Sequence, residues 1–159
     1  MKCHALTLWM LSPAILAQAP NPAPADAPLQ ALLDDWHEAA AKADEARYFG
    51  HLSEDAIFIG TDATERWTKA QFLTYCHPHF AKGRAWTFKA TRRVITLAPK
   101  GGLAWFDEDL ATTNMGPCRG SGVLRKDPDG RWRIVHYVLS LSVPNEKMGA
   151  VLIAVGTKK

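Results

Sequence analysis

The chain has 159 residues, of which 47% are hydrophobic and 22% are charged, and this is enough for one globular domain with a sizeable core and an additional leader or tail. Its formal charge of +3 is not concentrated in any run of lysine or arginine, so the sequence argues against nucleic acid or an anionic membrane surface as a partner.

Residues 1–19 have the parts of a secretory signal peptide. Lys2 supplies the positive start, residues 5–16 form an apolar run too short to span a bilayer, and small residues offer cleavage after Ala17 or Ala19. The alternatives are a buried helix and an uncleaved anchor. We predict a periplasmic or secreted protein with no membrane attachment after cleavage.

Residues 20–28 are rich in proline and alanine and lack large apolar side chains, a composition typical of an extended linker. The predicted domain covers residues 29–147, and a tail covers residues 148–159. Within the domain, apolar periodicity predicts helices first and strands afterwards. This order favours an α+β fold, in which helices gather on one face of a curved antiparallel sheet. The expected helices are residues 29–43, 46–52 and 69–80, and the expected strands are residues 56–60, 85–97, 103–112, 118–125 and 131–143.

Local sequence features also predict particular loops, turns and helix ends. Residues 61–66 are expected to form a polar loop, and Thr68 is expected to cap the third helix, which Pro78 should end or kink. The Asp129-Gly130 pair is typical of a hairpin turn between the last two strands. After Pro144, a final helix is expected to open at Asn145 and to run to Val155.

The last strand is apolar on both faces, so both faces should be covered. Period-two alternation places Trp132, Ile134 and His136 on one face, which we assign to the concave side. The opposite face carries Val135, Tyr137 and Leu139, and we expect it to form a two-fold homodimer interface.

Several segments together resemble a SnoaL-like protein of the nuclear transport factor 2-like superfamily, and they are residues 55–62, 65–68, 83–87, 104–108, 119–124 and 132–134. The resemblance covers residues 29–145. It implies a cone-shaped α+β fold in which helices wrap a curved sheet and leave a pocket on its concave side. Members of the superfamily include isomerases, cyclases, epoxide hydrolases, kinase association domains and transport adaptors, so the fold does not determine the function.

The steroid isomerases of this superfamily use a carboxylate base, a tyrosine and a protonated aspartate. The resemblance aligns these three positions with Gly60, Trp36 and Gly122, and none of these residues has the required side chain. Steroid-isomerase chemistry is therefore not expected unless Asp62 or Glu108 acts from another position.

Glu108 shares a strand face with Phe106 and Leu110, which predicts that its carboxylate points inward. Opposed side chains on neighbouring antiparallel strands lie roughly 5 Å apart, so we expect Glu108 beside His136 as a catalytic acid–base pair. If Glu108 pointed outward instead, Asp107 would take its role. Replacing Glu108 or His136 by alanine should weaken ligand binding and leave the fold largely intact.

The other candidate site residues are expected to bind a ligand. The set combines aromatic residues that would line the pocket with polar residues that would orient the ligand. Its members are Trp36, Asp62, Trp67, Trp86, Phe106, Arg119 and Trp132. Arg119 could bind an anionic group or form a structural ion pair.

Cysteine usage gives little further chemistry. After export only Cys76 and Cys118 remain, and they could form a disulfide if the fold brings them together. The run from Cys76 to His79 lacks metal-ligand spacing, because helical ligands are three or four residues apart. We predict no metal and no cofactor.

The sequence thus predicts an exported domain that binds a small, partly apolar molecule in a conical pocket. Two alternatives are open: a cofactor-free acid–base enzyme (isomerase, hydratase or hydrolase) and a non-catalytic dimeric interaction module. Burial should separate them, because the enzyme needs an enclosed acid in a cavity, whereas the module would fill its cone with aromatic side chains.

Overall fold

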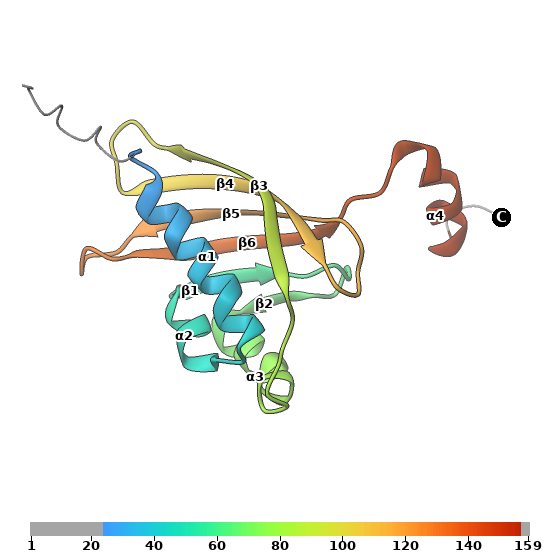
Figure 1. The fold of residues 1–159 in the computed structure, drawn as a ribbon, viewed down its shortest axis with the longest axis horizontal. Helices are drawn as coiled ribbons and strands as arrows, with labels where there is room; N and C mark the ends of the chain where they lie inside the picture. Colours follow the sequence, from blue (N-terminus) through green and yellow to red (C-terminus); the bar gives the residue numbers. More distant parts are fainter. Residues whose placement is uncertain (1–23, 157–159) are drawn as a thin grey trace, which may run out of the picture.

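A computed structural model describes residues 24–156. The predicted leader lies outside these described residues. Two helices come first, a third helix follows the first two strands of a six-stranded sheet, and a short C-terminal helix follows the last strand (Figure 1). The elements are α1 (Ala27–Ala41), α2 (Glu45–Gly50), β1 (Leu52–Ile59), β2 (Arg66–Thr68), α3 (Lys69–Phe80), β3 (Phe88–Leu97), β4 (Leu103–Thr112), β5 (Cys118–Lys126), β6 (Trp132–Leu141), the short 3-10 helix η1 (Asn145–Lys147) and α4 (Met148–Ala154).

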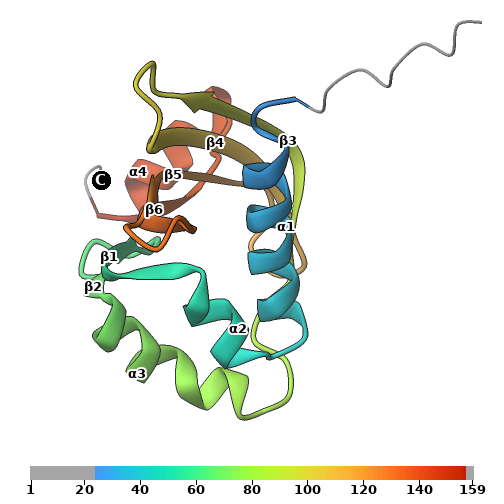
Figure 2. The same cartoon turned by 90° about the vertical axis from the view of Figure 1, so that its left-hand side faces the viewer.

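The sheet has the strand order β2-β1-β6-β5-β4-β3 and is strongly curved (Figure 2). All neighbouring pairs are antiparallel except β1 and β6, which run parallel. Helix α1 crosses the concave face of the sheet. Helices α2 and α3 lie beside the edge of the sheet that is formed by β1 and β2. The α+β fold with helices on one face of a curved sheet is therefore confirmed.

The local signals explain why most elements form where they do. Thr68 and Gln71 form a reciprocal capping box at the start of α3, as the cap prediction required. Pro78 does not end this helix, which continues to Phe80. Pro28 lies in the first turn of α1, where its missing N–H group needs no partner.

Some predicted boundaries were wrong. The expected loop over residues 61–66 is shorter, because the edge strand β2 begins at Arg66 and pairs with the end of β1. Strand β1 starts at Leu52, four residues before the expected Ala56. The C-terminal helix does form, but α4 has no buried residue and projects beyond the end of β6 (Figure 1).

The space between α1 and the sheet is filled by aromatic side chains. Trp36 of α1 is 1% exposed, stacks on Tyr48 with ring centroids 5.1 Å apart, and meets the edge of Tyr137 at 4.7 Å. Phe58 and Phe72 stack at 3.8 Å and extend this core towards α3. Aromatic side chains therefore fill the deep part of the concave side of the sheet, beneath α1.

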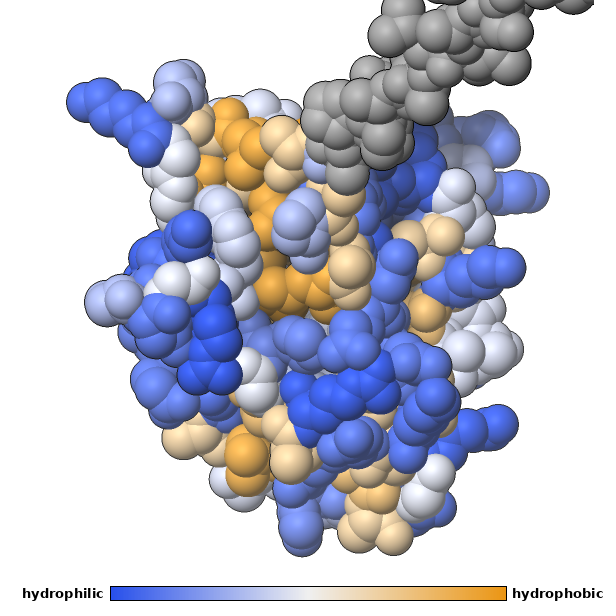
Figure 3. All heavy atoms as spheres, turned by 60° about the vertical axis from the view of Figure 1, so that its left-hand side comes forward, coloured by the Kyte–Doolittle hydropathy of each residue, from blue (hydrophilic) through white to orange (hydrophobic). Residues whose placement is uncertain are grey.

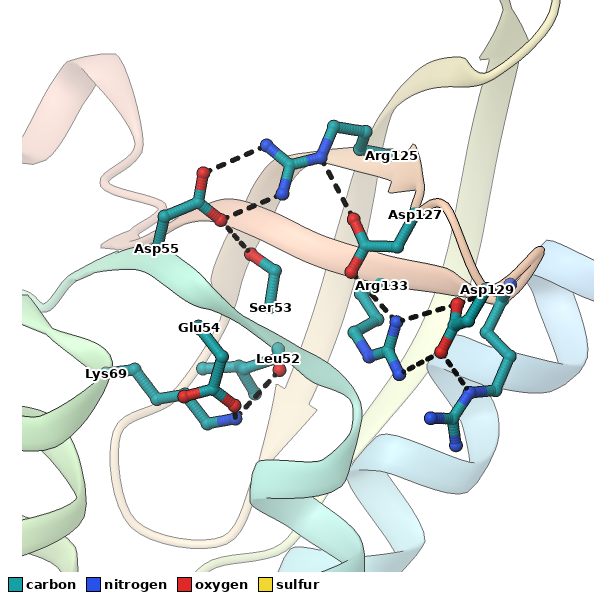
Figure 4. Close-up of polar contacts among 10 residues, drawn as sticks. Leu52, Ser53, Glu54, Asp55, Lys69, Arg125, Asp127, Asp129 and Arg133 are labelled. Carbon is teal, nitrogen blue, oxygen red and sulfur yellow. Dashed lines mark hydrogen bonds and ion pairs between the residues drawn. The ribbon is translucent and has the colours of Figure 1, made fainter.

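Alternating acids and arginines tie the β5–β6 hairpin to the start of β1 (Figure 4). Arg125 donates to both carboxylate oxygens of Asp55 at 2.9 Å and to Asp127 at 3.0 Å. Arg133 then bridges Asp127 and Asp129. These hydrogen bonds lower the pKa of Asp55 and Asp129 far below the ordinary range for aspartate. Because several charges are linked, the network holds this end of the sheet more firmly than isolated surface pairs would.

Candidate functional site

A cavity of about 250 Å³, which we call the aromatic pocket, opens at the end of the sheet that faces α3. It lies among the ends of β1 and β2, helix α3, the start of β3 and the loop between β4 and β5. Its lining residues are Phe58, Gly60, Thr61, Glu65, Trp67, Phe72, Tyr75, His79, Ala85, Trp86, Phe88, Asn114, Met115 and Leu139.

The aromatic walls hold one another in place. Trp67 pairs across the sheet with Phe58, and its indole stacks on Tyr75 of α3 with ring centroids 4.6 Å apart and planes 26° apart. Trp86 meets Tyr48 and Phe80 edge-on at 5.5 Å each. Rings packed in this way present rigid apolar walls, as small-molecule pockets usually do.

Polar groups reach the same pocket from different segments. Glu65 follows the loop after β1, His79 lies on α3, and Asn114 lies between β4 and β5. The carboxylate of Glu65 accepts the backbone N–H of Asp62 at 3.1 Å and lies over Gly60. Any side chain on Gly60 would collide with that carboxylate, so the glycine leaves room for Glu65 to turn towards the pocket.

The buried acid predicted from the sequence is present, but it lies elsewhere. Glu108 of β4 is 0% exposed, points to the concave side and does not line the aromatic pocket. Its Oε1 lies 2.8 Å from Nε2 of His37 and accepts the hydroxyl of Tyr137 at 3.2 Å. Its Oε2 accepts Nε–H of Arg93 at 2.8 Å. Both carboxylate oxygens therefore have partners within the protein.

These partners determine the charge state of Glu108. Burial alone would raise the pKa of Glu108, but the hydrogen bond and charge of His37, together with Arg93, outweigh burial and hold that pKa below its ordinary value of 4.5. The pKa of Tyr137 is raised well above its ordinary value by burial and by the neighbouring Glu108 charge. A carboxylate held charged by an arginine is poorly suited to proton transfer near neutral pH.

His136 does not lie beside Glu108, and this part of the prediction was wrong. The register of β5 against β6 shifts by one residue at this point. Val123 pairs with His136, but the next residue of β5, Leu124, pairs with Ile134. Val135 is the extra residue of this bulge, and an extra residue reverses the alternation of side chains beyond it. Tyr137 and Leu139 consequently point inward, and His136 points to the convex face.

A second bulge brings Arg93 to Glu108. Ala90 pairs with Leu110 and Arg92 pairs with Asp109, so Thr91 is skipped. Beyond this point Arg93 faces inward and stands opposite Glu108 in the register. The side chain of Arg93 is 5% exposed and also donates to Asp34 of α1 at 2.8 Å. Glu108 therefore has a cationic partner in Arg93, which an uninterrupted alternation of side chains along β3 did not predict.

The remaining predicted site residues fall into different surroundings. Trp67 and Trp86 line the aromatic pocket, as proposed, whereas Trp36 and Phe106 are buried in the core. Asp62 is exposed and bonded to Thr64. Arg119 lies on the convex face beside Asp109 at 3.5 Å.

Trp132 lines a separate open groove of about 750 Å³ between α1 and the β5–β6 hairpin. Figure 3 shows apolar side chains gathered in the hollow beside the start of α1. The predicted ligand-binding set is therefore divided among several parts of the molecule.

Cys76 and Cys118 are both free and buried, and burial raises the pKa of each thiol. Within residues 24–156, no group of three or more histidine, cysteine, aspartate or glutamate side chains is placed to hold a metal ion. His77 instead pairs with Glu45 at 3.0 Å. No helix in this part of the chain has the length and apolar character needed to cross a membrane.

Solved structures with the same fold are numerous and distant in sequence. A protein from Pseudomonas putida described as NTF2-like and of unknown function is 14% identical, with a TM-score of 0.64 over 77% of this chain and 90% of that chain. A domain of unknown function with a cystatin-like fold from Nostoc punctiforme is 13% identical, with a TM-score of 0.67 over 84% of this chain and 86% of that chain.

A protein from Parabacteroides distasonis, assigned provisionally as a ketosteroid isomerase, is 20% identical, with a TM-score of 0.58 over 73% of this chain and 86% of that chain. At these identities the likeness establishes the fold alone. No curated protein matches the chain. The SnoaL-like domain model matches residues 29–145, which is most of the chain. Together with its curved sheet and N-terminal helices, this match shows that the chain belongs to the SnoaL-like domain family.

Proposed function

We propose that this domain binds a small, partly apolar molecule in the aromatic pocket. The observation that carries the proposal is the convergence of Trp67, Tyr75 and Trp86 with the polar groups of Glu65 and His79 around one cavity. Its volume of about 250 Å³ is slightly below the roughly 300–1,000 Å³ typical of ligand pockets, so the ligand should be small.

Acid–base catalysis by Glu108 has less support. Glu108 is enclosed by His37, Arg93 and Tyr137, and its carboxylate has no access to the aromatic pocket. A general base must come within hydrogen-bond reach of the substrate proton, which this enclosure prevents. These contacts support a structural role for Glu108, and the lining of the aromatic pocket supports the proposal that a ligand binds there.

Replacing Trp67 by alanine should weaken binding in the aromatic pocket at least about fivefold, because truncating an aromatic wall costs about 1 kcal/mol or more of binding free energy. The measurement is isothermal titration calorimetry with benzyl alcohol, benzyltrimethylammonium and phenylacetate, which share a benzyl group and differ in charge. Trp132→Ala, in the separate groove, is the matched control and should bind like the wild type. Absence of binding by all three compounds, or equal losses in both variants, would refute the proposal.

We also propose a homodimer through the convex face of the sheet, with a different set of residues from the one expected from strict alternation. Tyr137 and Leu139 are buried in the core. The convex row instead runs through Trp105, Val123 and His136, which pair in register across β4, β5 and β6. Trp105 is 48% exposed, while Val123 and His136 are half-buried, and a large exposed apolar side chain on a sheet face is a common element of homodimer surfaces.

Trp105→Lys should convert the proposed dimer to a monomer, because it replaces the most exposed apolar side chain of this row by a charge. Light scattering at micromolar concentration measures the mass. Leu73→Lys changes an exposed apolar residue of α3, away from the convex face, and should remain dimeric. A monomeric wild-type protein would exclude this interface.

A further inference from the structure

The aromatic pocket has an uneven balance of charge. Among the described residues that line it there are one carboxylate, Glu65, one histidine, His79, and no lysine or arginine. We propose that its ligand carries a positive charge, as an amine or quaternary ammonium group attached to a small apolar body. This inference rests on the proposed function and specifies the chemical class of the ligand.

Glu65 differs from most carboxylates of this protein in having no cationic partner. Acids on the convex face and near the hairpin are paired with arginine, as Asp107 is with Arg92 and Asp55 with Arg125. Within residues 24–156, Glu65 makes no ion pair, and its carboxylate accepts only the backbone N–H of Asp62. Its negative charge is therefore available to a ligand cation.

The position of Glu65 is built into the fold. The backbone N–H of Gly60 donates to the carbonyl of Glu65 at 2.9 Å, which closes the loop between β1 and β2. The side chain then lies over Gly60, in space that any other residue at position 60 would occupy. Its charge also acts on the pocket wall, because burial and the Glu65 carboxylate together raise the pKa of Tyr75.

The aromatic walls favour the same charge. The face of an indole or phenol ring carries a negative quadrupole that attracts cations, and tryptophan is the strongest of the aromatic side chains in this respect. Trp67, Tyr75 and Trp86 line one cavity with Glu65, so a cation in it would meet rings and a carboxylate together. An anionic ligand would be repelled by both groups.

The test compares benzyltrimethylammonium with benzyl alcohol and phenylacetate by isothermal titration calorimetry. The cation should bind about fivefold more tightly than benzyl alcohol, which is the size of one partly exposed cation–π contact. Phenylacetate should bind more weakly than either. Equal or tighter binding of benzyl alcohol would overturn the charge assignment and leave the proposed function standing, whereas absence of binding by all three would refute the proposed function itself.

Glu65→Gln separates charge from shape. It should lower the affinity for benzyltrimethylammonium about fivefold and leave benzyl alcohol unchanged, because the amide keeps the size of the carboxylate. Glu54→Gln removes the same charge from an exposed side chain of β1 that borders a different cavity, so it should keep the preference for the cation. An unchanged preference in Glu65→Gln would overturn the assignment of Glu65 as the group that attracts the cation.

Discussion

Glu108→Gln is expected to lower the free energy of unfolding by about 3–5 kcal/mol, because it removes the buried carboxylate partner of Arg93 and leaves this buried guanidinium with only the exposed Asp34 as an ionic partner. Chemical denaturation measures this loss. Asp107→Asn is the matched control, since Asp107 immediately precedes Glu108 in β4, lies on the convex face and pairs with exposed Arg92. That change should cost no more than about 1 kcal/mol.

The same substitution should change the pH dependence of stability. The pKa of Glu108 is lowered in the folded protein, so its contribution is present above the unfolded pKa near 4.5 and is lost as the pH falls below that value. Glu108→Gln should therefore flatten the acid side of the stability curve.

If Glu108→Gln does not fold, the double variant with Arg93→Gln should recover part of the lost stability, because it removes the buried guanidinium as well as its carboxylate partner. A stable Glu108→Gln protein with lost ligand binding would instead support a catalytic or binding role for this acid.

Gly122→Ala is expected to destabilise the fold by about 1–3 kcal/mol, because an added methyl group overpacks the concave face. A Cβ atom at this position would collide with the backbone carbonyl of His136 and lie 2.9 Å from the ring of Phe106. The carbonyl belongs to the β6 backbone, so the clash cannot be relieved by a side-chain rotation.

Gly50→Ala is the control for this change. It lies at the end of α2, and a Cβ atom there would have no neighbour within 4 Å. Alanine is favoured over glycine in helices by up to about 1 kcal/mol, so this variant should be unchanged or slightly more stable. Equal stability of Gly122→Ala and Gly50→Ala in urea denaturation would contradict the tight packing of β5 against β6.

Alternation of side chains predicts much of the sheet, and its failures occur at bulges. Strand β4 pairs with β5 without a shift, so Phe106, Glu108 and Leu110 point inward as the sequence indicates. One extra residue, Val135, moves His136 to the convex face. Nothing in the composition of the strand marks such an insertion, because its two faces are almost equally apolar.

A helical pattern could have identified one partner of Glu108. His37 lies four residues after Leu33 on α1, and positions at this spacing share a helix face. The polar groups of the aromatic pocket are harder to find. Glu65, His79 and Asn114 are far apart in the sequence and are brought together only by the pairing of β1 with β2 and by the loop after β4. Sequence patterns therefore indicate that Trp67 and Trp86 line a pocket, but they do not indicate that the carboxylate of Glu65 lies beside them.

Indole proton resonances in a ¹⁵N-labelled sample test the central claim directly, because the described tryptophans lie in different surroundings. Trp67 and Trp86 line the aromatic pocket, Trp36 is in the core, Trp105 is on the convex face, and Trp132 borders the groove beside α1. Titration with benzyltrimethylammonium should shift the signals of Trp67 and Trp86 and leave the signal of Trp132 unchanged. A dominant shift of Trp132 or Trp105, with Trp67 and Trp86 unaffected, would contradict the assignment of ligand binding to the aromatic pocket.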